Sequence, residues 1–381
     1  MTNMLDPQAL RERLIPFSSL QYSTEAFIDY RIPECSPKYN YALIGPGVSQ
    51  NPNQPVSLRE PHGFQVGGVS MPHGKTNPPH MHFTCEVFMC VRGEWELHWG
   101  FNPDKRSVRI QAGDIVSVPT WIYRGFTNVG VDDGFMFTAL GGDDTGGILW
   151  GPSTLAAAAQ QGVHLTEDYQ LIDEQRGQRM APPLKPLVPM TPAEIAQLRD
   201  WPAAEMSGRL VRSQALAWST HGLLDSALDG CGGQLAPVIG LGMTEDRNSQ
   251  APIVNAHTLS VEWLRLPPGG RVSRHRLRDK QVLIAVEGDL RLELDGGQAP
   301  VDMALHGTDA SWDSYALPAG VWRSLHNTGR GPARALLLSS GDHRKRIEWA
   351  PDVVRAAAQA GWAIDANGFV APKRFVDRAQ R

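Results

Sequence analysis

Residues 71–97 of the chain read MPHGKTNPPHMHFTCEVFMCVRGEWEL, and residues 266–294 read LPPGGRVSRHRLRDKQVLIAVEGDLRLEL. The two segments align at a constant offset of 195 residues. Four positions of the first segment, Gly74, His80, Glu86 and Gly93, fall opposite Gly269, His275, Gln281 and Gly288. Self-similarity at a fixed offset is typical of a chain that contains the same structural unit twice.

A second pair of segments extends this repeat. Residues 113–130 read GDIVSVPTWIYRGFTNVG, and residues 312–329 read WDSYALPAGVWRSLHNTG. Four positions match at an offset of 199 residues: Asp114, Pro119, Arg124 and Asn128 opposite Asp313, Pro318, Arg323 and Asn327. Four residues inserted between the two blocks account for the change of offset. We therefore expect two copies of one domain.

Both blocks have the properties of β-strands. The runs VFMCV and VLIAV are short, are rich in β-branched and other apolar residues, and lead into a glycine. The runs VSVP and YALP end on proline, which cannot donate the next ladder hydrogen bond. Strands joined by glycine turns at short spacing favour antiparallel barrels. The predicted fold class is mainly β, with two antiparallel β-barrel domains in one chain and a few peripheral helices.

The repeat divides the 381 residues into five segments. These are an N-terminal arm (1–60), an N-terminal barrel (61–150), a partly helical connector (151–250), a C-terminal barrel (251–349), and a C-terminal helix and tail (350–381). Helices are expected in four runs: PQALRERL, STLAAAAQQ, TPAEIAQLRDW and PDVVRAAAQAGW. In the third run, Thr191 followed three residues later by Glu194 is the pattern of a capping box.

Composition narrows the range of partners. The net charge is −4 and no Lys/Arg run stands out, so nucleic acid is not expected as a partner. No stretch approaches the roughly 20 apolar residues of a membrane span. The N-terminus lacks the apolar core of a secretory signal, and Cys35, Cys85, Cys90 and Cys231 show no CxxC spacing. A cytoplasmic protein with buried free thiols is the expectation.

Three residues of the first barrel have the character of metal ligands. Side chains two residues apart on a strand share a face, so His80, His82 and Glu86 are expected to point to one side. Two imidazoles and one carboxylate with open coordination positions form the facial triad that suits non-haem Fe(II), with Mn, Ni, Zn and Cu as alternatives. Burying these groups for structure alone is costly, because each needs a polar partner.

The run from His80 to Gly93 resembles the first cupin motif, which reads HxH, three or four residues, Glu, six residues and Gly. Residues 113–128 resemble the second cupin motif, in which Gly, Pro, a His and a final Asn recur. The resemblance covers about half of the chain and implies the cupin barrel, a double-stranded β-helix. The chain departs from it at Arg124, which stands where cupins usually supply another His ligand.

Arginine stays protonated and cannot ligate a metal, so Arg124 has two opposite interpretations. Beside a metal, it could bind a substrate carboxylate or phenolate through paired hydrogen bonds. Without a metal, it could pair directly with Glu86. In the second barrel, Leu277 and Gln281 replace the second His and the Glu. His275 is therefore interpreted as a core histidine, and no metal is expected there.

Other residues of the first barrel are candidates for binding substrate. Trp121 and Tyr123 belong to an aromatic group that could line a pocket near the metal, although aromatic residues are also common in barrel cores. His98, on the strand after Gly93, could face inward. An ordinary core or surface role is the competing interpretation for each.

Bicupins with an N-terminal HxH site resemble the ring-cleaving dioxygenases that act on gentisate, 1-hydroxy-2-naphthoate or salicylate. The resemblance implies Fe(II), O2 and a small anionic aromatic acid as substrate. His80, His82 and Glu86 would hold the metal, and Arg124 would neutralise and orient the substrate anion. A His-His-Glu set also occurs in cupins that resemble 3-hydroxyanthranilate dioxygenase.

Two other classes of function remain open. The first is a redox-neutral metal-dependent cupin that acts as an isomerase, lyase or decarboxylase. The second is a metal-free bicupin that binds small anions through Arg124 and Arg323. A homodimer or homotetramer is expected, because cupins commonly assemble through the edges of their barrels.

Overall fold

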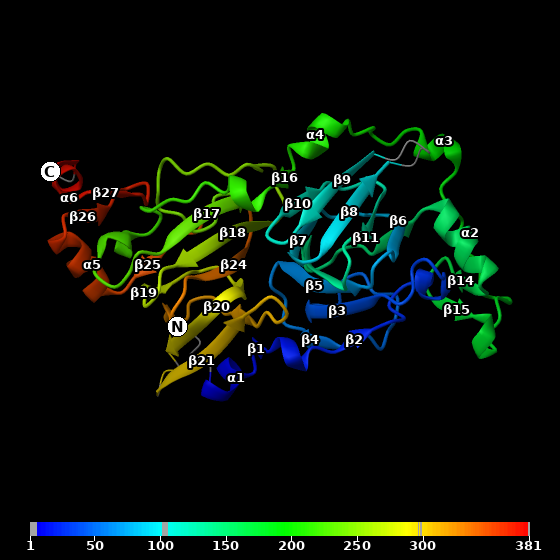
Figure 1. The fold of residues 1–381 in the computed structure, drawn as a ribbon, viewed down its shortest axis with the longest axis horizontal. Helices are drawn as coiled ribbons and strands as arrows, with labels where there is room; N and C mark the ends of the chain where they lie inside the picture. The colour runs from blue at the N-terminus through cyan, green and yellow to red at the C-terminus, as the bar shows by residue number, and fades with distance from the viewer. Residues whose placement is uncertain (1–5, 101–105, 296, 298, 380–381) are drawn as a thin grey trace. The chain divides into compact units, whose positions relative to one another are not determined.

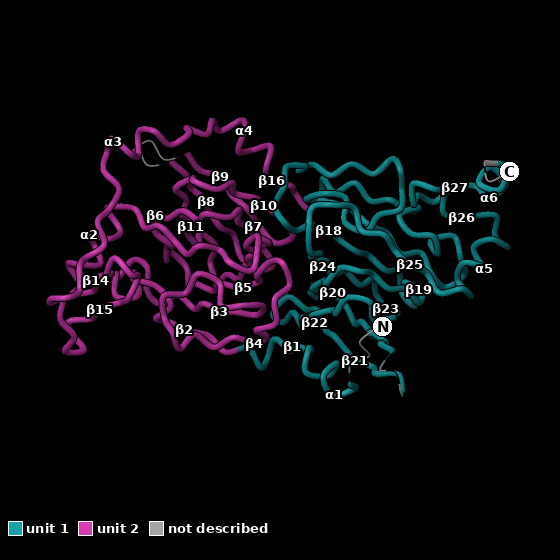
Figure 2. The backbone as a smooth tube through the Cα atoms, turned by 180° about the vertical axis from the view of Figure 1, so that it is seen from behind, with its two compact units in different colours: residues 1–20, 214–381 teal, residues 21–213 magenta. Residues whose placement is uncertain are grey.

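The computed structural model describes residues 6–100, 106–295, 297 and 299–379. The fold is mainly β, as predicted, with peripheral helices (Figure 1). The chain divides into two compact units (Figure 2). Residues 21–213 form the N-terminal unit, and residues 1–20 together with 214–381 form the C-terminal unit.

The N-terminal unit is a barrel of two facing sheets. In the first sheet the strand order is β16 (Leu210–Val211), β10 (Ile115–Val118), β7 (Glu86–Arg92), β12 (Gly134–Gly141), β5 (Phe64–Met71), β3 (Tyr39–Ile44) and β2 (Tyr22–Ser23), with β4 (Val56–Leu58) beside β3. In the second sheet the order is β13 (Ile148–Trp150), β6 (Thr76–His82), β11 (Arg124–Asn128), β8 (Glu94–Trp99) and β9 (Arg106–Gln111). Apart from the β3–β4 pair, these strands are antiparallel.

The C-terminal unit repeats this arrangement. Its strand order is β17 (Gln234–Ile239), β18 (Leu259–Leu266), β24 (Ala333–Ser340), β20 (Gln281–Asp295), β23 (Arg323–Asn327), β19 (Arg271–Arg276) and β25 (Glu348–Trp349). Strands β21 (Pro300–Gly307) and β22 (Ser314–Leu317) both pair with β20. The single strand β20 corresponds to β7 and β8 together, and both copies place a glycine with positive φ at the junction, Gly93 and Gly288.

The expected helices form, although most are short. They are α1 (Pro7–Arg11), α2 (Pro152–Gln160), α3 (Pro192–Ile195) and α5 (Pro351–Gln359). Two further helices, α4 (Ala203–Ser207) and α6 (Lys373–Ala379), were not expected. The capping box of α3 is present, with Thr191 and Glu194 bonded reciprocally. Helices α2 and α5 lie at the repeat offset, and each precedes a hairpin: β14 (Val163–Leu165) with β15 (Leu171–Asp173), and β26 (Trp362–Ile364) with β27 (Val370–Pro372).

The arm and the connector of the sequence prediction are both shared between the two units. Residues 1–20 belong to the C-terminal unit, where β1 (Leu14–Ile15) pairs with β22 and Leu10 enters the core. Residues 21–60 supply β2, β3 and β4 to the N-terminal barrel. At the far end of the connector, β17 adds a strand to the C-terminal sheet. Each of these segments becomes part of one barrel, because it adds a short strand to an exposed edge of that barrel's sheet.

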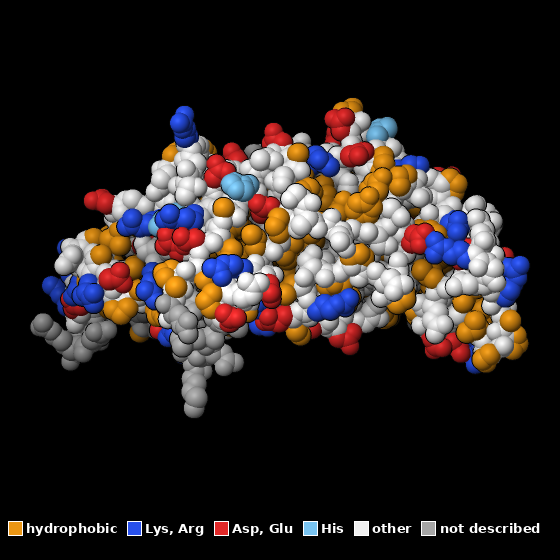
Figure 3. Space-filling model, turned by 90° about the horizontal axis from the view of Figure 1, so that it is seen from below, with side chains coloured by type: hydrophobic (Ala, Val, Ile, Leu, Met, Phe, Trp, Pro, Cys, Tyr) orange, Lys and Arg blue, Asp and Glu red, His pale blue; other side chains and the backbone are white. Residues whose placement is uncertain are grey.

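Each barrel has its own apolar core between its sheets. All four cysteines are buried and free, as predicted. Within the described residues, no helix has both the length and the apolar character that a membrane span requires. On the face shown in Figure 3, Lys and Arg side chains are interspersed with Asp and Glu side chains.

Candidate metal centre

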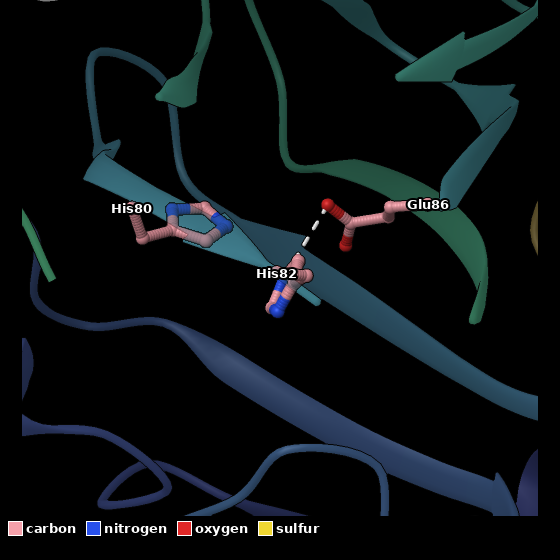
Figure 4. Close-up of side chains that lie close together, drawn as sticks. All are labelled: His80, His82 and Glu86. Atoms are coloured by element: carbon pink, nitrogen blue, oxygen red, sulfur yellow. Dashed lines mark ion pairs between the residues drawn. The ribbon is translucent and has the colours of Figure 1, made fainter. Parts of the chain in front are cut away.

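The three predicted ligands converge inside the N-terminal barrel. His80 and His82 lie two residues apart on β6, and Glu86 opens β7 (Figure 4). One ligand atom from each residue lies within 4.8 Å of the other two, and all three side chains are buried. His82 Nε2 lies 3.5 Å from Glu86 Oε2. The structure thus brings together the set that the motif indicated.

The route by which Glu86 reaches the site differs from the prediction. The two histidines share one face of one strand, but Glu86 lies on the facing sheet, beyond a turn at residues 83–85. The alternation of side chains along a single strand therefore explains the histidine pair only. Closure of the two sheets on each other supplies the carboxylate.

Each imidazole is oriented by a backbone carbonyl. His80 Nδ1 lies 2.9 Å from the carbonyl oxygen of Pro78, and His82 Nδ1 lies 3.2 Å from that of Gly147. A carbonyl can only accept, so each of these contacts places the proton on Nδ1 and leaves the Nε2 lone pair free. This is the tautomer that metal-binding histidines use, with the second nitrogen held by a backbone or carboxylate oxygen. Asn77 Nδ2 also lies 3.1 Å from His80 Nδ1 and could donate only to the opposite tautomer of that ring, but the carbonyl of Pro78 is the nearer partner.

The surroundings keep both rings neutral. Burial lowers the pKa of His80 and of His82 well below the ordinary value, and the positive charge of Arg124 lowers both further. Burial raises the pKa of Glu86, and Arg124 opposes that shift. Neutral imidazole is the form that binds a metal, so protons do not compete for these rings at neutral pH.

Arg124 pairs directly with Glu86. Its side chain is 0% exposed, its Nε donates to Glu86 Oε2 at 3.1 Å, and its Nη1 donates to the carbonyl of Ile122 at 3.0 Å. The remaining nitrogen, Nη2, has no partner in the part of the chain that the structure describes. Of the two interpretations of Arg124, the ion pair with Glu86 is therefore the arrangement observed. Both N–H groups of Nη2 are therefore left without an acceptor among the described residues.

A small cavity of about 70 Å³ adjoins the site. His80, His82 and Glu86 contribute to its wall, together with the polar side chains of Lys38 and Gln65. On this measure about 10–15 Å³ is the least volume that holds one water, so the cavity has room for a few waters.

A buried ion pair forms part of the wall. The ammonium of Lys38 donates to Asp29 and to Asn77 Oδ1. All three side chains are buried, and Asn77 lies on β6 three residues before His80. Lys38 could not be identified from the sequence, because it lies about forty residues before the motif and has no motif of its own. An isolated lysine is far more often a surface residue.

The residues present suit a divalent metal. Two neutral imidazoles expose Nε2 lone pairs, and Glu86 Oε1 accepts no hydrogen bond from any described residue. Three such donor atoms directed at one point, with a cavity beside them, match a facial triad that leaves coordination positions of the metal open. In the described chain, this is the one group of three His, Cys, Asp or Glu side chains close enough to share an ion.

The equivalent cluster of the second barrel has a different composition. Arg323 Nη2 donates to Gln281 Oε1 at 2.6 Å, and His275 Nδ1 lies 2.8 Å from the carbonyl of Ser273. Burial lowers the pKa of His275 to about 3, so the ring is neutral. Leu277 fills the position of the second histidine and is buried in the core. The cluster contains no carboxylate.

The candidate substrate-binding residues lie outside the cavity. Trp121 is 45% exposed and, with Tyr123 and Trp99, lines a separate depression of about 530 Å³ beside α3. His98 is buried on β8, in register with Gly125. None of the three predicted residues is part of the wall described above.

Comparisons with known proteins agree with this architecture. A family model for the cupin domain matches residues 68–139, which run from β5 to β12. No curated protein matches the sequence. Among solved structures, a Lactobacillus farciminis oxalate decarboxylase in its formate complex is 12% identical, with a TM-score of 0.52, over 90% of this chain and 89% of that chain.

Plant vicilins are also similar. Vicilin from Corylus avellana (hazelnut) is 13% identical with a TM-score of 0.52, and vicilin from Solanum lycopersicum (tomato) is 12% identical with a TM-score of 0.53. Each match covers 97% of this chain and 96% of the vicilin. The chain therefore has the two-barrel cupin fold. At these identities the likeness concerns the fold alone.

Proposed function

We propose that the N-terminal barrel is a metal-dependent enzyme that acts on a small organic acid. The observation that carries the proposal is the convergence of His80, His82 and Glu86 beside a cavity. A bound divalent ion would supply Lewis-acid polarisation of a substrate oxygen, and iron(II) would also supply electrons for O2 chemistry. The protein's own groups would bind and orient the acid.

The charges around the cavity favour an anionic substrate. Arg124 neutralises Glu86, Lys38 neutralises Asp29, and the two ligand imidazoles are neutral. A divalent ion held by these residues would therefore carry its full charge of two into the site. Arg124 would hold the Glu86 carboxylate in position, and the third N–H group of Lys38 would meet a substrate carboxylate.

Two reactions fit this site. The set of two histidines and one carboxylate supports an Fe(II)-dependent dioxygenase that cleaves a hydroxylated aromatic acid. The size of the cavity supports a redox-neutral reaction, such as decarboxylation, of a shorter acid. A cavity of about 70 Å³ suits an acid of a few non-hydrogen atoms better than a hydroxybenzoate, which has about ten. The oxalate decarboxylase among the similar structures acts on an acid of the shorter kind.

Metal content and turnover test the proposal together. The chain would be purified without oxygen, loaded separately with Fe(II) and Mn(II), and analysed for bound metal. O2 uptake and CO2 release would then be measured with oxalate and malonate, and with salicylate and gentisate. CO2 release without O2 uptake identifies a decarboxylase, and O2 uptake with an aromatic acid identifies a dioxygenase.

Matched variants locate the activity. His82→Ala is expected to lose metal and turnover together. Lys38→Met is expected to keep the metal and raise KM for the acid. His275→Ala, at the equivalent of His80 in the second barrel, is expected to retain both. A wild-type protein that binds neither metal after loading would contradict the proposal.

A further inference from the structure

The second barrel contains a buried cation that has no counter-ion. Arg323 is 3% exposed and lines a cavity of about 20 Å³ whose remaining wall is mostly apolar. Its Nη2 donates to Gln281, which is uncharged, and its Nη1 has no partner among the described residues. No carboxylate of the described chain lies within 4.0 Å of a nitrogen of this guanidinium, so the charge is left uncompensated.

The first barrel shows what is missing. Arg124 holds the equivalent position there and is neutralised by Glu86. In the second barrel Gln281 takes the place of Glu86, while the arginine is kept. Burial lowers the pKa of Arg323 only to about 10, so the side chain is a cation at neutral pH. An isolated charge in an apolar interior is costly unless an opposite charge accompanies it.

The cavity sets the size and charge of that partner. Its volume of about 20 Å³ accommodates one or two water-sized atoms, which excludes an organic acid of several carbons. His275 is neutral and Gln281 is uncharged, so the site carries the single positive charge of Arg323. A monovalent anion of atomic size satisfies both conditions.

We propose that the second barrel is a binding site for a small monovalent anion of the size of chloride, held by Nη1 of Arg323 inside the apolar cavity. The site stabilises the C-terminal barrel by supplying the negative charge that Glu86 supplies in the first barrel. It is independent of metal binding and of catalysis in the N-terminal barrel.

Thermal unfolding in different salts tests this site. The full chain would be melted in sodium chloride, sodium bromide and sodium gluconate at equal ionic strength, because gluconate is too large for the cavity. The wild type is expected to melt about 3 °C higher or more in chloride and bromide than in gluconate, once the halide exceeds its dissociation constant about tenfold. Equal melting temperatures in all three salts would overturn the proposal.

Two variants and a control assign the effect to Arg323. Arg323→Met removes the charge, and Gln281→Glu supplies a built-in carboxylate, so both are expected to lose the halide response. Gln281→Glu is also expected to melt in gluconate at least as high as the wild type does in chloride. Arg330→Gln changes an exposed arginine and is expected to keep the wild-type response.

Diffraction from wild-type crystals in sodium bromide covers the case in which a variant does not fold. An anomalous peak against Arg323 Nη1 is the expected result. The absence of a peak at saturating bromide, or a halide response in Gln281→Glu equal to that of the wild type, would overturn the assignment.

Discussion

Arg124 donates to Glu86 through Nε at 3.1 Å, at the position where a cupin barrel commonly places a further metal ligand. The carboxylate thus contacts both a permanent cation and His82. This relationship fixes the charge of the site, because Arg124 cancels Glu86 without occupying a coordination position. The same arginine recurs in the second barrel as Arg323, where a neutral glutamine faces it.

The Glu86–Arg124 pair is expected to be essential to the stability of the metal-free barrel. Arg124→Met leaves the Glu86 carboxylate buried without its cation and should lower the free energy of unfolding by about 3–5 kcal/mol. The double variant Arg124→Met/Glu86→Gln should recover much of this loss, because no unpaired charge remains. Urea denaturation measures both. Additive effects of the two substitutions would contradict the coupling.

Metal affinity should depend on the ligands of the first barrel and not on His275 of the second. His80→Ala removes an Nε2 donor and is expected to weaken Mn(II) or Fe(II) binding by at least about 100-fold, since even the partners of ligands contribute tenfold or more. Isothermal titration calorimetry measures the affinity. His275→Ala is the control and should bind metal as the wild type does. Equal affinities in the two variants would place the metal elsewhere.

The stability of the C-terminal barrel should fall as pH rises from 4.5 to about 8. Burial raises the pKa of Glu262 from 4.5 to about 8, and one of its oxygens has no partner in the described chain. Between these values the folded state holds a proton that the unfolded chain has released. The stabilisation is complete below pH 4.5 and is lost through pH 8, by about 1.4 kcal/mol per pH unit.

The variant Glu262→Gln tests this linkage. Urea denaturation at pH 5 and pH 8.5 should show a smaller difference in the variant than in the wild type. Some pH dependence should remain, because burial also raises the pKa of Glu245 to about 8. An unchanged slope in Glu262→Gln would show that this carboxyl does not titrate in the window.

Gly125 should tolerate no side chain. It follows Arg124 on β11, and a Cβ there would lie 2.4 Å from His98 Nε2 and 2.5 Å from the backbone oxygen of Asn77. Gly125→Ala is expected to cost about 1–3 kcal/mol and to weaken metal binding by displacing β6. Gly331→Ala, where a Cβ would meet nothing within 4 Å, should stay within about 0.5 kcal/mol of the wild type. Differential scanning calorimetry compares the two.

Much of the fold could be predicted because its signals are local and occur twice. Glycines at positive φ, prolines at strand ends and runs of β-branched residues act within a few neighbours, and the repeat made each copy support the other. The pair His80 and His82 was predictable for the same reason, since strand alternation alone places them on one face. The capping box at Thr191 is another local signal that the structure contains.

The contacts of the other residues of the site could not be predicted from local sequence patterns. The alignment of the two repeats identified Arg124. The sequence alone could not distinguish between its two interpretations, a contact with substrate and an ion pair with Glu86. Lys38 reaches the cavity from a segment before the barrel motif and pairs there with Asp29. Trp121 and Tyr123 lie outside the cavity although they are close to Arg124 in sequence. Which strands face each other decides such contacts.

Two β-barrels, the first with two histidines and a glutamate suited to a metal, could be predicted from the sequence. Short-range rules on turns, strand alternation and donor chemistry were sufficient for both. Three features could be known only from the packing of the sheets: Glu86 meets the histidines from the opposite sheet, Arg124 neutralises Glu86, and Arg323 has no carboxylate partner among the described residues. These facts depend on distances between residues far apart in the chain, which the packing of one sheet on another fixes and no local pattern records.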